Sequence, residues 1–286
     1  MRPGTCDLHL HSVVSDGLLA PADLAARAAR AGLRTLALTD HDAVDGVAEL
    51  QAAAAQRVEG QDVRLEVIPA IELTARVRGG PQGSVHLLGY GLDLAAPRLA
   101  AAARHNRLAK RAQIEAILRR LAKDEQVHLG WDEVAPGRGD DAYVGRNQVA
   151  AALVRRGQAK TYRHAFQRFL ADRRVPPPAV VDAAEAVAAL REAGALVVLA
   201  HPTHHDLDHH LRPLLDLGLD GVEAYRPHAH GGLLERIERA ARDHGLFVTG
   251  GSDWHGHHPD PPLGSWRLEP GRVDAFLAAI RGRAPG

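Results

Sequence analysis

The sequence is poor in cysteine and in aromatic residues. Cys6 is the only cysteine, and aromatic residues make up 4% of the 286 positions. A single thiol excludes an internal disulfide, so the chain is not a small secreted domain held by disulfides, and a cytoplasmic protein is expected. Cys6 lies in a predicted strand, where we expect a buried and unreactive thiol.

Long apolar runs and an excess of either charge are also absent. No stretch is long enough to span a bilayer and none has the composition of a signal peptide, so neither membrane insertion nor export is expected. With 35 basic and 35 acidic residues the formal net charge is zero. This balance argues against bulk electrostatic binding of nucleic acid, although a local basic pocket for phosphate is compatible with it. No feature indicates an obligate protein partner.

The chain is instead rich in histidine, with 18 residues. The segment Asp7-Leu8-His9-Leu10-His11 is predicted to form a strand, and residues two apart on a strand point to the same face. His9 and His11 would therefore project together from the carboxyl end of this strand, where α/β barrels assemble their active sites. We interpret them as two ligands of one metal ion.

Most of the other residues that could bind metals follow short apolar runs. A single histidine is more often a surface residue or a satisfied core residue than a ligand. The repetition of the pattern in five separate segments favours ligands instead. These candidates are Asp16, His41, Glu72, His86, His201, Asp253 and His255.

The order of the predicted elements indicates an α/β fold. Strands and helices alternate over residues 5–72, and a glycine-rich stretch at 79–83 separates two further strands. A long helix is expected over residues 97–124, and short helical segments are expected over residues 126–178. We therefore divide the chain into a barrel (residues 1–100 and 179–286) and a helical insert (residues 101–178).

Nitrogen and carboxylate ligands without thiolates suit Zn²⁺, Mn²⁺ or Fe²⁺. Six histidines and three carboxylates are too many for one ion, so two or three divalent ions are expected. Such centres commonly hydrolyse phosphate esters, because they lower the pKa of a bound water so that hydroxide attacks phosphorus, and they offset the charge of the transition state. The residues alone thus favour phosphoester hydrolysis over amide hydrolysis or deamination.

The motifs that carry these residues resemble those of the PHP (polymerase and histidinol phosphatase) superfamily, over the whole length of the chain. The similar segments are His9-Leu10-His11, Asp16-Gly17, Thr39-Asp40-His41-Asp42, Glu72, His86, Ala200-His201-Pro202 and Ser252-Asp253-Trp254-His255-Gly256.

The resemblance implies a distorted (β/α)₇ barrel with a trinuclear metal centre. Its three ligand sets would be His9, His11, Glu72 and Asp253; then Glu72, as a bridge, with His86 and His201; and finally Asp16, His41 and His255. Asp7, Asp40 and Asp42 would either orient these ligands or cap the ends of strands.

The predicted insert resembles that of one branch of the superfamily, in which it caps the active site. This branch contains nucleoside 3′,5′-bisphosphate phosphatases and ribonuclease AM, a 5′-to-3′ exoribonuclease. The chain departs from the branch at Asn147-Gln148, where the branch has Pro-His, and at residues 171–176, which replace a glycine-rich stretch. The resemblance implies a metal-dependent phosphoesterase that acts on a 3′,5′-bisphosphonucleoside or on short 5′-phosphorylated RNA.

Arginine suits phosphate because its guanidinium donates two parallel hydrogen bonds. We predict substrate contacts by Arg146, Arg107, Arg111 and His228, although an arginine on a helix is more often solvated or ion-paired. His228 would alternatively protonate the leaving oxygen, as an imidazole can do near neutral pH.

Catalytic roles are assigned to His9, His11 and Asp253, through the metal, and to His228. The histidines that follow His201, at positions 204, 205, 209 and 210, are expected in a solvent-exposed loop. Two other functions stay open, namely a phosphatase for histidinol phosphate or a nucleoside monophosphate, and a metal-binding accessory protein without turnover.

Overall fold

The computed structural model describes residues 5–55, 65–78, 84–171, 175–257, 262–266, 268 and 271–283. The predicted glycine-rich stretch at 79–83 and the divergent residues 172–174 lie outside these ranges. Contacts within the chain divide it into two compact units. We call them the sheet unit, Met1–Ala103 with Val181–Gly286, and the helical unit, Arg104–Val180.

The sheet unit is built on seven strands that follow one another in space in the order of the sequence. β4 is antiparallel to both of its neighbours, whereas all other neighbouring pairs are parallel. The predicted α/β class is therefore confirmed. The strands are β1 (Thr5–Leu10), β2 (Leu33–Leu38), β3 (Glu66–Arg76), β4 (Ser84–Tyr90), β5 (Leu196–Leu199), β6 (Gly221–Tyr225) and β7 (Phe247–Gly250).

Hydrogen bonds link the first strand to the segment that follows the last one. The amide of Asp253 donates to the carbonyl of His9 at 2.9 Å, and the amide of His11 donates to the carbonyl of Trp254 at 3.0 Å. The two edges of the sheet thus meet near residues 9–11, while a fully closed barrel stays a prediction.

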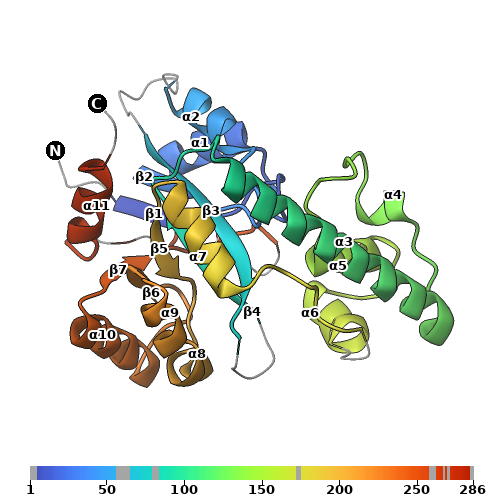
Figure 1. The fold of residues 1–286 in the computed structure, drawn as a ribbon. Coiled ribbons are helices and arrows are strands. Elements are labelled where there is room, and N and C mark those ends of the chain that lie inside the picture. Colours follow the sequence, from blue (N-terminus) through green and yellow to red (C-terminus); the bar gives the residue numbers. More distant parts are fainter. Residues whose placement is uncertain are drawn as a thin grey trace. The chain divides into compact units, whose positions relative to one another are not determined.

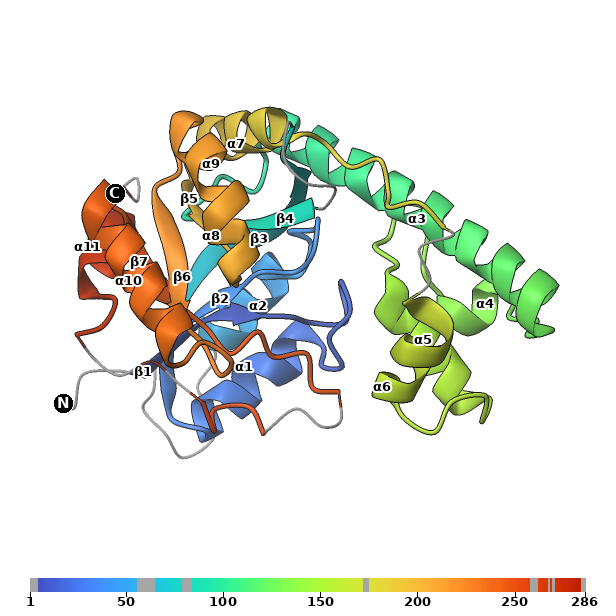
Figure 2. The same cartoon turned by 90° about the horizontal axis from the view of Figure 1, so that it is seen from below.

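Helices of the sheet unit lie around the strands (Figures 1 and 2). The first begins at Pro21, which presets the helical φ and lacks a donor that would be unpaired there, and it ends just before Gly32, whose φ is 86°. The helices are α1 (Pro21–Arg30), α2 (Val47–Ala55), α7 (Ala183–Glu192), α8 (His204–His209), α9 (Leu211–Asp216), α10 (Gly232–His244) and α11 (Asp274–Arg281).

Alternating side chains of the strands enter different apolar clusters. On β5, Val197 and Leu199 pack in a cluster that includes residues of α7, whereas Leu196 and Val198 pack in a cluster that includes Phe276 of α11. Both faces of this strand are therefore buried, as expected for a mostly parallel sheet covered by helices.

The helical unit has an apolar core of its own. Ile114 and Leu121 of the long helix pack with Val144, Val149 and Leu153 in one buried cluster. The helix was expected over residues 97–124, and its observed range confirms that expectation. The elements are α3 (Pro97–Glu125), whose residues up to Ala103 belong to the sheet unit, α4 (Trp131–Val134), α5 (Arg146–Arg155), α6 (Tyr162–Ala165) and the π-helix η1 (Phe166–Leu170). Within the described ranges, no helix combines the length and apolar character needed to cross a membrane.

Candidate metal centre

His9 and His11 lie at the carboxyl end of β1 and both are fully buried. The Nε2 atoms of His9 and His11 lie 3.3 and 3.2 Å from the same oxygen, Oδ1 of Asp253. The same two nitrogens lie 3.4 and 3.3 Å from Oε2 of Glu72. Two imidazoles and two carboxylates from three separate segments therefore surround one position.

Glu72, which is also fully buried, turns its two oxygens to different neighbours. Oε2 lies 2.9 Å from Nδ1 of His41. Oε1 lies 2.8 Å from Nδ1 of His86 and 2.9 Å from Nε2 of His201. This carboxylate thus has the geometry of a bridge between two sets of imidazoles.

Asp16 gathers another set of imidazoles. Its Oδ1 lies 3.3 Å from Nε2 of His255 and 3.8 Å from Nε2 of His41. Nδ1 of His11 lies 3.9 Å from the same oxygen.

Ligand atoms that lie within 4.8 Å of one another form three groups in the described chain. His201 falls outside these groups, although its Nε2 lies close to Glu72 and 3.2 Å from Nδ1 of His86. The groups are His11, Asp16, His41 and His255; His9, His11, Glu72 and Asp253; and His41, Glu72 and His86.

Several buried ligand atoms make no hydrogen bond within the described part of the chain. They are Nε2 of His9, Nε2 of His11 and Oε2 of Glu72. A buried polar atom without a partner costs on the order of 1–3 kcal/mol. Divalent cations would satisfy these atoms, and the nitrogen and oxygen donors fit Zn²⁺, Mn²⁺ or Fe²⁺.

The electrostatics keep the carboxylates ionised. Burial raises the pKa of Asp16, but His41 and His255 outweigh burial and hold this pKa well below its usual range. Burial likewise raises the pKa of Glu72, and His41, His86 and His9 bring it well below its usual range. Both carboxylates are therefore charged acceptors at neutral pH.

The imidazoles differ from one another. Burial lowers the pKa of His86 to about 4, because the attraction of Glu72 offsets only part of it. Burial also lowers the pKa of His255, but Asp16 outweighs it and raises this pKa to about 10. His86 is thus neutral and ready to bind a cation, whereas His255 must release a proton before it can do so.

The backbone is strained at and beside candidate ligands. Among the described residues, the non-glycine positions with positive φ include Asp42 (48°), His201 (30°) and Asp253 (53°). Each such conformation costs about 1–3 kcal/mol and is typical of functional sites. Gly251 permits the close approach of β1, because a Cβ there would lie 2.2 Å from Cβ of His9.

Asp40 and Asp42 are buried, and they accept hydrogen bonds from a neighbouring loop and from β3, respectively. Asp40 accepts hydrogen bonds from the amide and hydroxyl of Ser12, at 2.8 and 2.6 Å, and from the hydroxyl of Ser15 at 2.5 Å. Asp42 accepts one from the amide of Thr74 at 2.9 Å. Asp40 therefore fixes the loop that carries Asp16.

Sequence analysis missed a buried carboxylate on β6. Glu223 is fully buried and lies 2.9 Å from Nδ1 of His9. The signal that could have found it is a carboxylate within the apolar strand Gly221–Tyr225, since Glu72 occupies a similar position in β3.

The arginines that are predicted to contact substrate lie on α3 and α5. Arg107 and Arg111 of the helical unit donate to Asp141 and Asp140, at 3.1 and 3.0 Å. The guanidinium of Arg146 is exposed and lies 5.9 Å from the centre of the Phe166 ring.

Two positions singled out from the sequence have definite local structure. His228 is exposed in the segment after β6. Gln148, at one of the departures from the branch, accepts a hydrogen bond from the amide of Gly145 at 2.8 Å and so caps the start of α5. Contact between these side chains and a substrate stays a prediction.

The expectation of a loop after His201 was wrong, whereas the expected exposure holds for His204, His205 and His209. The helix α8 runs from His204 to His209. It begins at His204 because the side chain of Thr203 caps it by accepting a hydrogen bond from the amide of Asp206. His210 is buried and its Nδ1 lies 2.9 Å from Oδ1 of Asp206.

An α/β fold that gathers histidines and carboxylates from several strands into one cluster is typical of metal-dependent hydrolases. The profile of the PHP domain matches residues 7–129. A 3′,5′-nucleoside bisphosphate phosphatase of Chromobacterium violaceum is 32% identical to the chain, over 90% of this chain and 93% of the relative. The chain therefore belongs to the PHP family, and the predicted family is confirmed.

Two further relatives of the chain are enzymes named for different reactions. The 5′-3′ exoribonuclease Rnm of Salmonella typhimurium is 29% identical, over 90% of this chain and 87% of the relative. A phosphoribosyl 1,2-cyclic phosphate 1,2-diphosphodiesterase of Eggerthella lenta is 32% identical, over 92% and 98%. Each of these relatives is named as an enzyme that hydrolyses a phosphate ester.

A solved structure of a protein from Bifidobacterium adolescentis has the same fold. It superimposes with a TM-score of 0.84 at 28% sequence identity and covers 100% of this chain and 99% of its own.

Proposed function

We propose that the protein is a metal-dependent phosphoesterase that acts on 3′,5′-bisphosphorylated nucleosides or on the 5′ end of short RNA. The arrangement around Glu72 carries this proposal, because one oxygen faces His41 and the other faces His86 and His201. A carboxylate between two sets of imidazoles suits neighbouring ions, and clustered ions are the usual means of hydrolysing phosphate esters. Action in the cytoplasm is part of the proposal, since a single thiol suits a reducing compartment.

Two or three divalent ions would be held by the nine candidate ligands. The donor atoms accept Mn²⁺, Fe²⁺ and Zn²⁺ alike, so cellular supply would decide which is bound. The proposed sets are His9, His11, Glu72 and Asp253; Glu72, His86 and His201; and Asp16, His41 and His255.

Ions bound there would provide a nucleophilic water near neutral pH and would offset negative charge on the phosphoryl group. The protein's own part is to fix the ligands and to leave one side open. The side chains of His9 and Glu72 are fully buried, whereas those of His201 and Asp253 are 30% and 37% exposed. We expect a phosphate group to enter from the side of His201 and Asp253.

His228 is proposed to protonate the leaving oxygen, and Arg146, Arg107 and Arg111 are proposed to contact substrate phosphate. Support for Arg107 and Arg111 is weaker, since both already donate to carboxylates of their own unit. That the helical unit caps the centre also stays a prediction from the sequence.

Substrate choice is best tested in one parallel assay. Protein loaded with Mn²⁺ would receive 3′-phosphoadenosine 5′-phosphate, a short 5′-phosphorylated RNA, a phosphoribosyl 1,2-cyclic phosphate, AMP and histidinol phosphate. Inorganic phosphate and the organic product of each ester would be measured, which for the RNA is a nucleoside 5′-monophosphate. We expect the highest kcat/KM for the bisphosphate or the RNA.

Other outcomes of this assay have distinct meanings. Preference for the cyclic phosphate, AMP or histidinol phosphate would keep the hydrolase and overturn the substrate assignment. Tight binding of Mn²⁺ without turnover of any ester would instead favour an accessory protein.

A further inference from the structure

Glu223 holds two of the candidate ligands with its two oxygens. Oε1 accepts from Nδ1 of His9 at 2.9 Å, and Oε2 accepts from the backbone amide of His201 at 2.7 Å. The residue is fully buried on β6 and belongs to none of the three ligand groups. Burying a carboxylate this deeply would be costly without partners. Both of its hydrogen-bond partners belong to candidate ligands, His9 and His201.

The bond to His9 decides which ring nitrogen is free. A carboxylate can only accept, so Nδ1 of His9 carries the hydrogen and the lone pair of a neutral ring lies on Nε2. Nε2 is the atom that lies within 3.4 Å of both Glu72 and Asp253 and makes no hydrogen bond within the described chain. Glu223 therefore turns the binding nitrogen of His9 towards the other ligands.

The bond to His201 acts on the backbone. His201 has a φ of 30°, a conformation that costs about 1–3 kcal/mol for a residue with a side chain. Its side chain nevertheless places Nε2 at 2.9 Å from Oε1 of Glu72. A charge-assisted hydrogen bond to the amide helps to hold this backbone in place.

We propose that Glu223 is a positioning residue that couples two ion positions, because it sets the tautomer of His9 and fixes the backbone of His201 at the same time. This inference rests on the proposed metal centre. Histidine ligands commonly donate their second nitrogen to a carboxylate, and losing that carboxylate typically weakens metal binding by about 10- to 100-fold.

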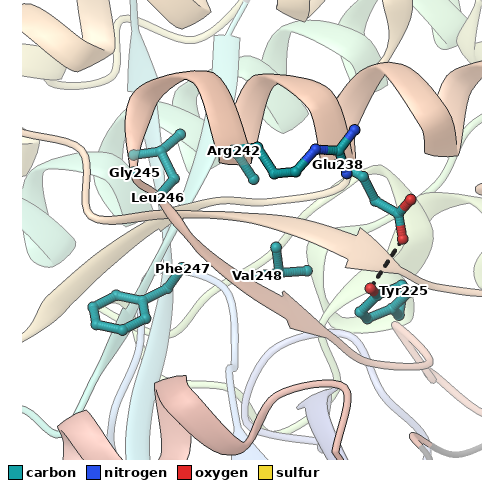
Figure 3. Close-up of a pocket in the computed structure, with 8 residues that line it drawn as sticks. Tyr225, Glu238, Arg242, Gly245, Leu246, Phe247 and Val248 are labelled. Atoms are coloured by element: carbon teal, nitrogen blue, oxygen red, sulfur yellow. Dashed lines mark hydrogen bonds between the residues drawn. The ribbon is translucent and has the colours of Figure 1, made fainter.

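Glu223→Gln is the sharpest variant, because it keeps the shape of the side chain but leaves one acceptor oxygen for two donors. Whichever way the amide turns, its NH₂ group faces either Nδ1 of His9 or the amide of His201. The matched control is Glu238→Gln on α10. Glu238 accepts from the hydroxyl of Tyr225 at 3.0 Å in a pocket of about 540 Å³ that none of the candidate ligands lines (Figure 3).

Zn²⁺ is the probe, added to metal-free full-length protein and followed by calorimetric titration and by metal analysis after dialysis. We expect Glu223→Gln to bind Zn²⁺ about 10- to 100-fold more weakly or to retain fewer ions, and Glu238→Gln to match the wild type. Unchanged Zn²⁺ binding in Glu223→Gln would overturn the proposal and leave the metal centre standing. Absence of Zn²⁺ binding in the wild type would overturn the proposed function itself.

A measurement on the wild type keeps the proposal testable if Glu223→Gln does not fold. In Zn²⁺-loaded protein with ¹⁵N-labelled histidine, NMR identifies which nitrogen of each ring binds the ion and which carries a proton. We expect His9 to bind through Nε2 with Nδ1 protonated. Binding through Nδ1, or a His9 that does not bind, would overturn the role of Glu223 even if other histidines hold Zn²⁺.

Discussion

The sheet unit and the helical unit place charge in opposite ways. In the sheet unit the interior holds a cluster of imidazoles and carboxylates, including the fully buried His9, His11 and Glu72. In the helical unit only Asn106 and Lys110 are buried polar residues among those described, and Lys110 lies 4.7 Å from the centre of the Tyr143 ring.

This difference separates binding from stability. Burying charged groups costs several kcal/mol per ion unless partners compensate, and an apolar core of the same volume is often as stable. The helical unit has such an apolar core, which includes Ile114, Leu121 and Leu153. The sheet unit also buries charged groups, which is understandable if its interior charges serve a ligand rather than the fold.

The largest expected effect comes from removing one interior ligand. His11→Ala or Asp253→Ala should abolish turnover while the fold is retained. We expect a loss at least as large as the roughly 100- to 1000-fold that follows removal of one transition-state donor. The measurement is kcat on the preferred ester, with circular dichroism as a check of the fold.

A variant with the same residue change away from the centre controls for the loss of an imidazole. His244→Ala suits this purpose, because His244 is exposed at the end of α10. Full activity in His11→Ala or Asp253→Ala would contradict the assignment of the metal centre.

Another prediction concerns the part of the sheet unit where the interior is apolar. Cys6 is 3% exposed, and burial, with a smaller contribution from Asp7, raises the pKa of its thiol from an ordinary 9.0 to about 12. At pH 9 the reactive thiolate should therefore be about 500-fold rarer in the folded than in the unfolded protein. Iodoacetamide labelling at pH 9 should be very slow until urea unfolds the chain.

The sign of the pH dependence follows from the same shift. Between pH 9 and 12 the folded state keeps a proton that the unfolded state loses, so this thiol contributes stability below pH 9 that is lost as the pH rises towards 12. Cys6→Ala gives the labelling background and should show a smaller loss of stability in this range. Rapid labelling of the folded protein would contradict the burial of Cys6.

The strand-end pattern in the sequence was enough to select most of the side chains that the fold brings together, and the limits of that pattern have physical causes. His9 and His11 could be predicted because strand periodicity puts them on one face. The carboxylate of Glu223 within an apolar strand was a visible signal, but its role could not be predicted, because that role depends on contacts with His9 and His201, which lie far from it in the sequence. The α/β class followed from local patterns, while the start of α8 at His204 depended on a cap by Thr203 that was not recognised.

The predicted substrate contacts also show the limit of prediction from local sequence patterns. An arginine on a helix carries no signal for its partner, and Arg107 and Arg111 donate to Asp141 and Asp140 in the structure. Sequence can therefore propose an arginine for phosphate, but only tertiary contacts show what else competes for its guanidinium.

In the helical unit, a core substitution should change stability and leave metal binding alone. Leu121 is fully buried, so Leu121→Ala should lower the free energy of unfolding by about 2–5 kcal/mol. Leu108→Ala is the matched control on the same helix, since Leu108 is 38% exposed and its loss should cost no more than about 0.5 kcal/mol. Urea unfolding and metal analysis would check both, and loss of bound metal in folded Leu121→Ala would break the contrast between the units.

The smallest expected effect comes from removing an exposed charge of the helical unit, that of Arg146. This substitution tests whether the helical unit takes part in catalysis. If Arg146 contacts substrate phosphate, Arg146→Ala should raise KM by roughly 10-fold, the equivalent of one charged hydrogen bond, with kcat little changed. Arg156→Ala is the control, because Arg156 follows the same helix and is ion-paired with Glu133 at 2.7 Å. An unchanged KM in Arg146→Ala would remove this residue from the substrate contacts. An equal rise of KM in both variants would instead indicate a general effect of positive charge, because the position of Arg146 would then make no difference.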